Sequence, residues 1–208
     1  MFRRQPLSVN MPRIWLFSDE RLAAPMTDLA AILPPGSGIV VRHDSLAPGE
    51  RWRLFRRLAR TARARRLALF LAGSPALARR WGADGVHLRQ AMACRAKQAH
   101  RLRLCLAMPV HDVGQARTAR RVRADAAFIS PLYPTRSHPG DDALARATWL
   151  RLARLAGGQA VALGGMTPSR ARQLNRASKA NPGWAAIDAW DEKAAKRRRR
   201  QKRNAVPT

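Results

Sequence analysis

The stretch "LALFLAGSPALARRWGADGVHL" (residues 67–88) contains the unit that repeats along the chain. Residues 67–72 form a short apolar run, residues 75–83 have helical spacing, and residues 84–88 form a second apolar run. Apolar runs this short are typical of parallel strands that are buried on both faces. The stretch therefore predicts a strand, a helix with a basic outer face, and a second strand.

The same alternation continues in both directions from this unit. Further apolar runs lie at residues 13–17, 38–43, 103–107, 125–130, 159–163 and 183–187. Further stretches of helical spacing lie at residues 50–66, 113–124, 143–156 and 167–178. Eight strands alternating with helices predict an α/β fold, a single (β/α)8 TIM barrel at the short end of its size range. An open doubly wound sheet is the rival fold, but eight regular units without a topological break favour closure.

Length and composition bound the domain organisation. With 208 residues, 46% of them hydrophobic, one core is expected. We expect an N-terminal extension (1–12), the barrel (13–190) and a basic, partly disordered C-terminal tail (191–208). No apolar run reaches the length of a membrane span, and the first residues lack a secretory signal. Cys94 and Cys105 are too few for a disulfide scaffold, so we expect two buried thiols and a cytoplasmic protein.

The formal net charge of +27 raises the question of a nucleic-acid partner. The tail segment "KAAKRRRRQKRN" (193–204) is a basic block of the kind that contacts phosphate backbones without sequence specificity. Most basic residues lie outside this block, however, and most are arginines. The favoured interpretation is arginine-rich, solvated helix faces and a disordered tail, with non-specific nucleic-acid contact by the tail as the alternative. No aromatic-interleaved basic motif or zinc spacing supports a dedicated nucleic-acid-binding protein.

The loop "SPLYPTRSHPG" (130–140) follows the sixth predicted strand, on the face where barrels carry their functional groups. Its prolines stiffen the backbone, so we expect Thr135, Ser137 and His138 to point toward a cavity shared by His111 and the turn at residues 164–165. The alternative is a rigid loop whose polar groups bond only its own backbone. Histidines at four strand ends support a functional rim, and they are His43, His87, His111 and His138.

A second candidate site is "ALGGMTPSRA" (162–171), after the seventh predicted strand. Gly164 and Gly165 let the backbone approach a ligand, and Thr167 and Pro168 are suited to begin a helix. Exposed amides and a helix N-terminus favour a phosphate group at this place in a barrel. The alternative is a tight turn with a helix cap.

Three motifs, "GADGVHL" (82–88), "SPLYPTRSHPG" (130–140) and "ALGGM" (162–166), resemble the thiamine phosphate synthase/TenI family in order and spacing. The resemblance extends from about Arg13 to Ala189. It implies a TIM barrel of thiamine metabolism that binds a small phosphorylated ligand. The family's synthases join a pyrimidine diphosphate to a thiazole phosphate and release pyrophosphate with Mg²⁺. TenI-like members are thiazole tautomerases or have no assigned chemistry.

At the expected binding site, only some positions match the family's pattern. The positions that keep the family's pattern are Arg42, His87, Gln90, His111, Thr135 and Ser137. At the positions of the family's metal carboxylates, and of its diphosphate-binding glutamine and lysines, the chain has Val40, Asp44, Ala72, Gly73, Met92 and His138. Mg²⁺ prefers carboxylate and phosphate oxygens, so these replacements argue against a diphosphate–metal site.

We therefore expect a metal-independent, tautomerase-like enzyme without a cofactor, in which the resemblance implies His111 as the catalytic acid or base. The expected ligand-binding residues are Arg42, His87, Gln90, Thr135, Ser137, His138, Gly164 and Gly165. One alternative is a thiamine phosphate synthase that uses Mg²⁺, and another is an inactive barrel that binds a phosphorylated thiazole or pyrimidine. Whether the chain forms a homo-oligomer stays open.

Overall fold

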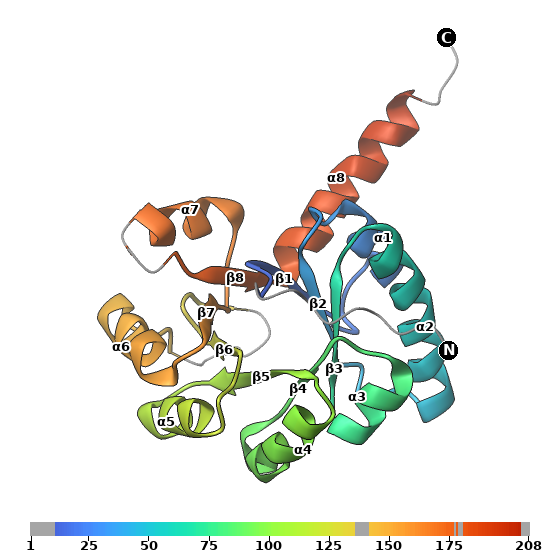
Figure 1. Cartoon of the computed structure of the whole chain (residues 1–208). Coiled ribbons are helices and arrows are strands. Elements are labelled where there is room, and N and C mark those ends of the chain that lie inside the picture. Colours follow the sequence, from blue (N-terminus) through green and yellow to red (C-terminus); the bar gives the residue numbers. More distant parts are fainter. Residues whose placement is uncertain (1–10, 136–141, 177, 179–180, 205–208) are drawn as a thin grey trace.

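The computed structural model describes residues 11–135, 142–176, 178 and 181–204, and within them the predicted barrel is confirmed (Figure 1). Eight parallel strands pair in sequence order, and β8 pairs with β1 to close the sheet. The strands are β1 (Ile14–Phe17), β2 (Gly38–Val41), β3 (Ala68–Ala72), β4 (Gly85–His87), β5 (Cys105–Val110), β6 (Ala126–Ile129), β7 (Gln159–Ala162) and β8 (Gly183–Ala186). The helices are α1 (Met26–Ile32), α2 (Pro48–Ala64), α3 (Pro75–Trp81), α4 (Ala96–Arg101), α5 (Val113–Arg121), α6 (Arg146–Ala156), α7 (Pro168–Arg176) and α8 (Asp188–Asn204).

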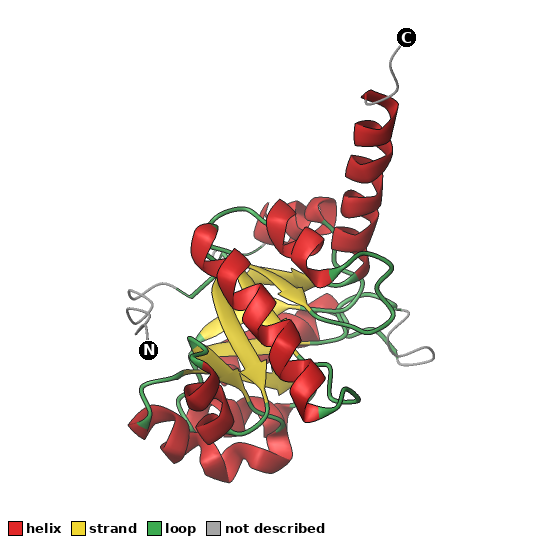
Figure 2. Ribbon diagram, turned by 90° about the vertical axis from the view of Figure 1, so that its right-hand side faces the viewer, coloured by secondary structure: helices red, strands yellow, loops and turns green. Residues whose placement is uncertain are grey.

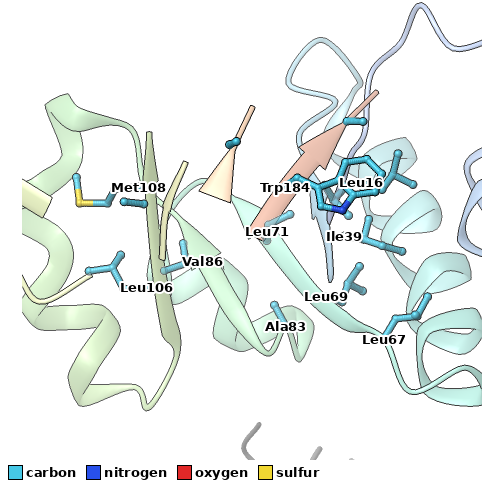
Figure 3. Close-up of a cluster of buried hydrophobic side chains, with 14 of the residues drawn as sticks. Leu16, Ile39, Leu67, Leu69, Leu71, Ala83, Val86, Leu106, Met108 and Trp184 are labelled. Atoms are coloured by element: carbon cyan, nitrogen blue, oxygen red, sulfur yellow. The ribbon is translucent and has the colours of Figure 1, made fainter. Parts of the chain in front are cut away.

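Alternation along each strand divides the core into two layers. Leu16 and its neighbours point outward and pack under the helices, and Figure 3 shows part of this layer. Trp15 points into the barrel, where its ring meets those of Phe70 and Phe128 edge to face, with centroids 5.0 and 5.2 Å away. An added Cβ at Gly38 would lie 2.2 Å from the Trp15 ring. The position of the ring therefore requires a glycine at residue 38. Large and small residues together fill the barrel interior.

Some elements differ from the sequence prediction. Helix α1 was not predicted, and neither was the segment formed by α4 and the preceding 3-10 helix η1 (Gln90–Arg95), because both pieces are short. Strand β5 continues past the predicted residue 107 to Val110. Pro109 lies in this extension, opposite Phe128 of β6, although proline lacks the N–H that a strand donates.

The C-terminal tail forms a helix up to Asn204, where we expected partial disorder. Trp190, only 3% exposed, anchors its first turns because its indole Nε1 donates to the carbonyl of Trp15 at 3.1 Å. The ring also stacks on Trp184 at 5.3 Å. Most of the following residues are alanine, lysine and arginine, which have high helix propensity and favour continuation of the helix. Figures 1 and 2 show its distal part projecting away from the barrel.

The two cysteines differ in their surroundings. Cys94 is exposed, so the expectation that it fills the core was wrong: it lies on η1, a short helix that leaves its side chain on the surface. Cys105 is partly buried, and burial raises the pKa of its thiol to about 11. None of the helices among the described residues is long and apolar enough to cross a membrane.

Candidate functional site

A cavity of about 230 Å³ opens at the carboxyl ends of β6, β7 and β8, and we call it the β7–β8 cavity. This is the face on which barrels carry their functional groups. Its polar and glycine lining comes from seven positions that follow strands and from the first turns of α8. These residues are Arg42, His111, Ser130, Thr135, Gly164, Gly165, Thr167, Asp188 and Glu192.

A second cavity, of about 520 Å³, lies beside the first over the ends of β1 to β6, and we call it the β2–β5 cavity. Its lining residues that do not line the first cavity include His43, Asp44, His87 and Arg89. The two cavities share a junction made of Phe17, Arg42, His111, Ser130 and Leu163. A ligand that spans both cavities would therefore pass His111 and Arg42.

His111 directly follows β5 and lies at the junction with its ring position fixed. Its Nδ1 lies 2.9 Å from the carbonyl oxygen of Ser130, and the Ser130 hydroxyl is 3.4 Å away. Because a carbonyl oxygen only accepts, Nδ1 carries the proton and Nε2 of the neutral ring keeps its lone pair. The backbone N–H of His111 donates to the side chain of Gln115 at 3.0 Å. An imidazole held in this tautomer can take a proton at Nε2 and return it.

The turn after β7 depends on its two glycines. Gly164 has φ +90° and Gly165 has φ +57°, a backbone region that disfavours other residues. A Cβ at Gly164 would lie 2.8 Å from the Cα of Pro131, so the turn packs closely on the loop after β6. Within the described part of the chain, the amides of Gly164 and Gly165 have no hydrogen-bond acceptor. Both glycines line the β7–β8 cavity, and free backbone amides are the kind of donor that binds an anion.

Helix α7 begins at the same cavity. Thr167 caps it by accepting from the N–H of Arg170 at 3.3 Å, as the sequence predicted. The Arg170 guanidinium donates to the carbonyl of Gly165 and covers the ring of Tyr133 at 4.3 Å. Tyr133 is thus packed under the arginine. The glycine turn and the start of α7 form one fixed unit.

Arg42 is oriented by residues that follow β1. Its guanidinium donates to Asp19 at 2.9 Å and to the Ser18 carbonyl at 3.2 Å. A hydrogen bond from Arg21, with the charges of Arg21 and Arg42, lowers the pKa of Asp19 to about 2 despite partial burial. The charge of Arg42 is therefore compensated on one side, while the residue lines both cavities.

His87 ends β4 and lies under the β2–β5 cavity, 7% exposed. Its ring meets those of Phe17 and Phe128 edge to face, with both centroids 5.5 Å away. Burial, and then the charges of Arg42 and Arg89, lower its pKa to about 3. Nδ1 is buried and finds no hydrogen-bond partner among the described residues. His87 is therefore neutral at physiological pH.

Two further positions on this rim are occupied by local contacts. His43 has φ +46°, and its Nδ1 lies 2.8 Å from the hydroxyl of Ser18; burial lowers its pKa. Asp44 forms ion pairs with Arg51 at 3.1 Å and with Arg89. These contacts fix the rim of the β2–β5 cavity.

The residues present do not fit a Mg²⁺ ion at the positions where the family resemblance implies one. Ala72 ends β3, and Met92 packs against the core from η1. Asp19 and Asp44, which line the β2–β5 cavity, are each paired with two arginines. In the described ranges, no three His, Cys, Asp or Glu side chains are grouped to hold a metal.

The structure brings most of the sequence-predicted site residues to the two cavities. Thr135 lines the β7–β8 cavity with His111 and the glycine turn. Ser137 and His138 lie outside the described residues. Gln90 lines neither cavity; its amide donates to the carbonyl of Pro109 at 2.5 Å and supports the end of β5 instead.

Sequence reasoning missed several lining residues: Asp19, Ser130, Asp188 and Glu192. The first three could have been found from their position, because each comes within two residues of the end of a strand. Glu192 lies one helical turn after Asp188, and no feature of the sequence marks it as a lining residue.

Comparisons with known proteins agree with the barrel fold. A family model described as thiamine monophosphate synthase matches residues 19–189. Thiamine phosphate pyrophosphorylase from Pyrococcus furiosus is 18% identical, with a TM-score of 0.72, and the match covers 90% of this chain and 97% of that one. No curated protein sequence matches significantly.

Two other solved structures share the fold. FabK from Thermotoga maritima is 11% identical, with a TM-score of 0.66, over 86% of this chain and 59% of that one. A Rubisco-like protein from Rhodopseudomonas palustris is 17% identical, with a TM-score of 0.62, over 95% and 65%. The chain spans less than two thirds of either protein, and at these identities the likeness shows the fold alone.

Proposed function

From the premise that the chain belongs to the thiamine monophosphate synthase/TenI family, whose model matches residues 19–189, we propose that it binds a thiazole phosphate and transfers a proton on the thiazole ring. In this proposal the protein is a metal-independent, tautomerase-like isomerase, and His111 is its acid and base. No cofactor is needed, because an imidazole can supply both proton-transfer steps.

The tautomer of His111 is the observation that carries the proposal. The Ser130 carbonyl holds the proton on Nδ1 and leaves the lone pair on Nε2. Nε2 takes a proton from one position of the bound ring, and the imidazolium returns a proton to a second position. Charge and atoms balance without an oxidant or a metal. The Ser130 carbonyl also stabilises the transient imidazolium, because the Nδ1–H bond strengthens when the ring is charged.

The β7–β8 cavity supports a single phosphate as the anchor of the substrate. The amides of Gly164 and Gly165 and the start of α7 offer donors on one side. Asp188 and Glu192, at the start of α8, bring negative charge to the lining of the same cavity. A diphosphate with its higher charge would be repelled more strongly than a monophosphate unless a metal compensated it.

Thiamine phosphate synthase activity is the second candidate, favoured by one observation. Arg42 and Arg89 line the β2–β5 cavity and are the kind of side chains that bind a diphosphate. Both already form ion pairs with carboxylates. The positions at Ala72 and Met92 supply no metal ligand, and for this reason we place the activity second. A catalytically inactive, ligand-binding barrel is the third candidate.

The three candidates separate in one set of measurements with the full chain. The thiazole carboxylate phosphate tautomer is incubated with the protein in EDTA, and its isomerisation is followed by NMR. We expect acceleration, and we expect His111→Gln to reduce it by about 10²-fold or more, while His100→Gln on α4 leaves it unchanged.

Thiamine phosphate formed from pyrimidine diphosphate, thiazole phosphate and Mg²⁺ would favour the synthase instead. If neither reaction occurs but thiazole phosphate raises the melting temperature, the chain is a binding barrel. An undiminished isomerisation rate in His111→Gln would remove the assigned role of His111.

A further inference from the structure

The distal part of α8 has no role in the proposed function and carries a dense positive charge. Ala194 is buried against the barrel, and beyond it the chain continues as a helix to Asn204. Figure 2 shows this part extending past the ends of the barrel helices. Residues 193–200 of α8 carry six basic side chains. Five are exposed, namely Lys193, Lys196, Arg197, Arg199 and Arg200, and Arg198 is half-buried. None of the six forms an ion pair within the residues that the structure describes.

The charge covers every side of the helix. Residues 197–200 are four consecutive arginines, and four residues complete a full helical turn. A helix that lies on a membrane surface needs an apolar face, and this segment has none. Like charges one turn apart, such as Lys193–Arg197 and Lys196–Arg200, repel one another and destabilise the free helix. A polyanion that surrounds the helix would remove this repulsion.

We propose that residues 193–200 of α8 form an arm that binds double-stranded nucleic acid through its phosphate backbone, without sequence specificity. The major groove of B-DNA, about 12 Å wide, admits an α-helix. Arginines on all sides of a helix in that groove can reach phosphates of both strands. Arginine also donates two parallel hydrogen bonds to a phosphate, which lysine cannot do. The partner is a polyanion, and the proposal is independent of the chemistry at His111.

The arm is tested by fluorescence anisotropy with a labelled DNA duplex of about 20 base pairs, over a range of salt concentrations. The test variant changes four arginines of the arm to glutamine, which keeps the helix propensity: Arg197, Arg198, Arg199 and Arg200. The matched control removes the same charge from exposed arginines of α2: Arg53, Arg56, Arg57 and Arg60. Melting temperature and far-ultraviolet circular dichroism verify that both variants are folded.

We expect the wild-type chain to bind the duplex with a steep dependence on salt. In the arm variant, the slope of the logarithm of the association constant against the logarithm of the salt concentration should be shallower by about 3–4. Its affinity at 0.1 M salt should be lower by at least about 30-fold. The α2 variant should lose less than about 3-fold. Equal losses in both variants would attribute binding to net charge and overturn the proposal.

Two other outcomes would also overturn it. Preferential binding of vesicles that contain phosphatidylserine over the duplex would assign the arm to a lipid surface. Absence of wild-type binding to the duplex at low salt would leave the arm without this function.

Discussion

The buried histidine at the end of β4 predicts a specific loss of stability in acid. His87 has a pKa lowered to about 3 by burial, whereas an unfolded histidine titrates near 6.5. Below pH 6.5 the unfolded chain binds a proton that the folded chain excludes, so stability falls as the pH falls toward 3. Integrated from neutral pH to pH 4.5, the difference amounts to about 2.5 kcal/mol of unfolding free energy.

The substitution His87→Phe should remove this contribution. The phenyl ring keeps the edge contacts with Phe17 and Phe128, and the β2–β5 cavity beside it leaves room for the larger ring. Urea denaturation at pH 7.5 and pH 4.5 gives the unfolding free energy of each protein. We expect the drop between the two pH values to be about 2.5 kcal/mol smaller in His87→Phe than in the wild type.

Because the measured quantity is a difference between two pH values, a constant change in packing energy cancels. His100→Gln on the outer surface is the control. Its unfolding free energy should fall between pH 7.5 and pH 4.5 by the same amount as that of the wild type. If His87→Phe loses as much stability in acid as the wild type does, His87 is protonated in the folded protein, and the assignment of a neutral ring fails.

Three further substitutions test other parts of the structure, and for each the unfolding free energy is measured. Gly164→Ala should cost at least about 1 kcal/mol more than Gly36→Ala, because both glycines have positive φ but only the first meets backbone atoms within 3 Å; equal costs would contradict the close packing of the turn. Trp190→Phe should cost about 1–2 kcal/mol by removing the buried bond to the Trp15 carbonyl, with a loss of helical circular dichroism from α8; an unchanged spectrum and stability would mean that the indole does not anchor this helix. Asp19→Asn should cost about 1 kcal/mol at pH 7, discounted because Arg21 is half exposed, and the cost should shrink as the pH falls from 3.8 toward 2; a pH-independent cost would point to lost packing instead.

Local patterns in the sequence were sufficient to predict the barrel. Each strand is a short, continuous apolar run, which is the pattern of a parallel strand buried on both faces. The division of Leu16 and Trp15 between the outer and inner layers becomes visible only in the structure. The position of His111 at a strand end also followed from this pattern. By contrast, α1 is too short for helical periodicity to distinguish it from a loop.

The contacts that define the site depend on neighbours far apart in the chain. Ser130 fixes the tautomer of His111 through its backbone carbonyl, which any residue at that position supplies, so the sequence carries no signal of it. Gln90 was predicted to bind a ligand, but its amide reaches the carbonyl of Pro109 across 19 residues. Such pairings are set by strand register and loop geometry. The helical tail was missed because its anchor, the bond from Trp190 to Trp15, joins the two ends of the barrel.

The central claim, proton transfer by His111 without a metal, is tested most directly by hydrogen exchange into the substrate. The thiazole carboxylate phosphate is incubated with the protein in D₂O and EDTA, and deuterium incorporation into the ring is measured by NMR. We predict incorporation with the wild-type chain and a rate lower by about 10²-fold or more in His111→Gln. Equal rates in the two proteins, or exchange that requires added Mg²⁺, would contradict the account.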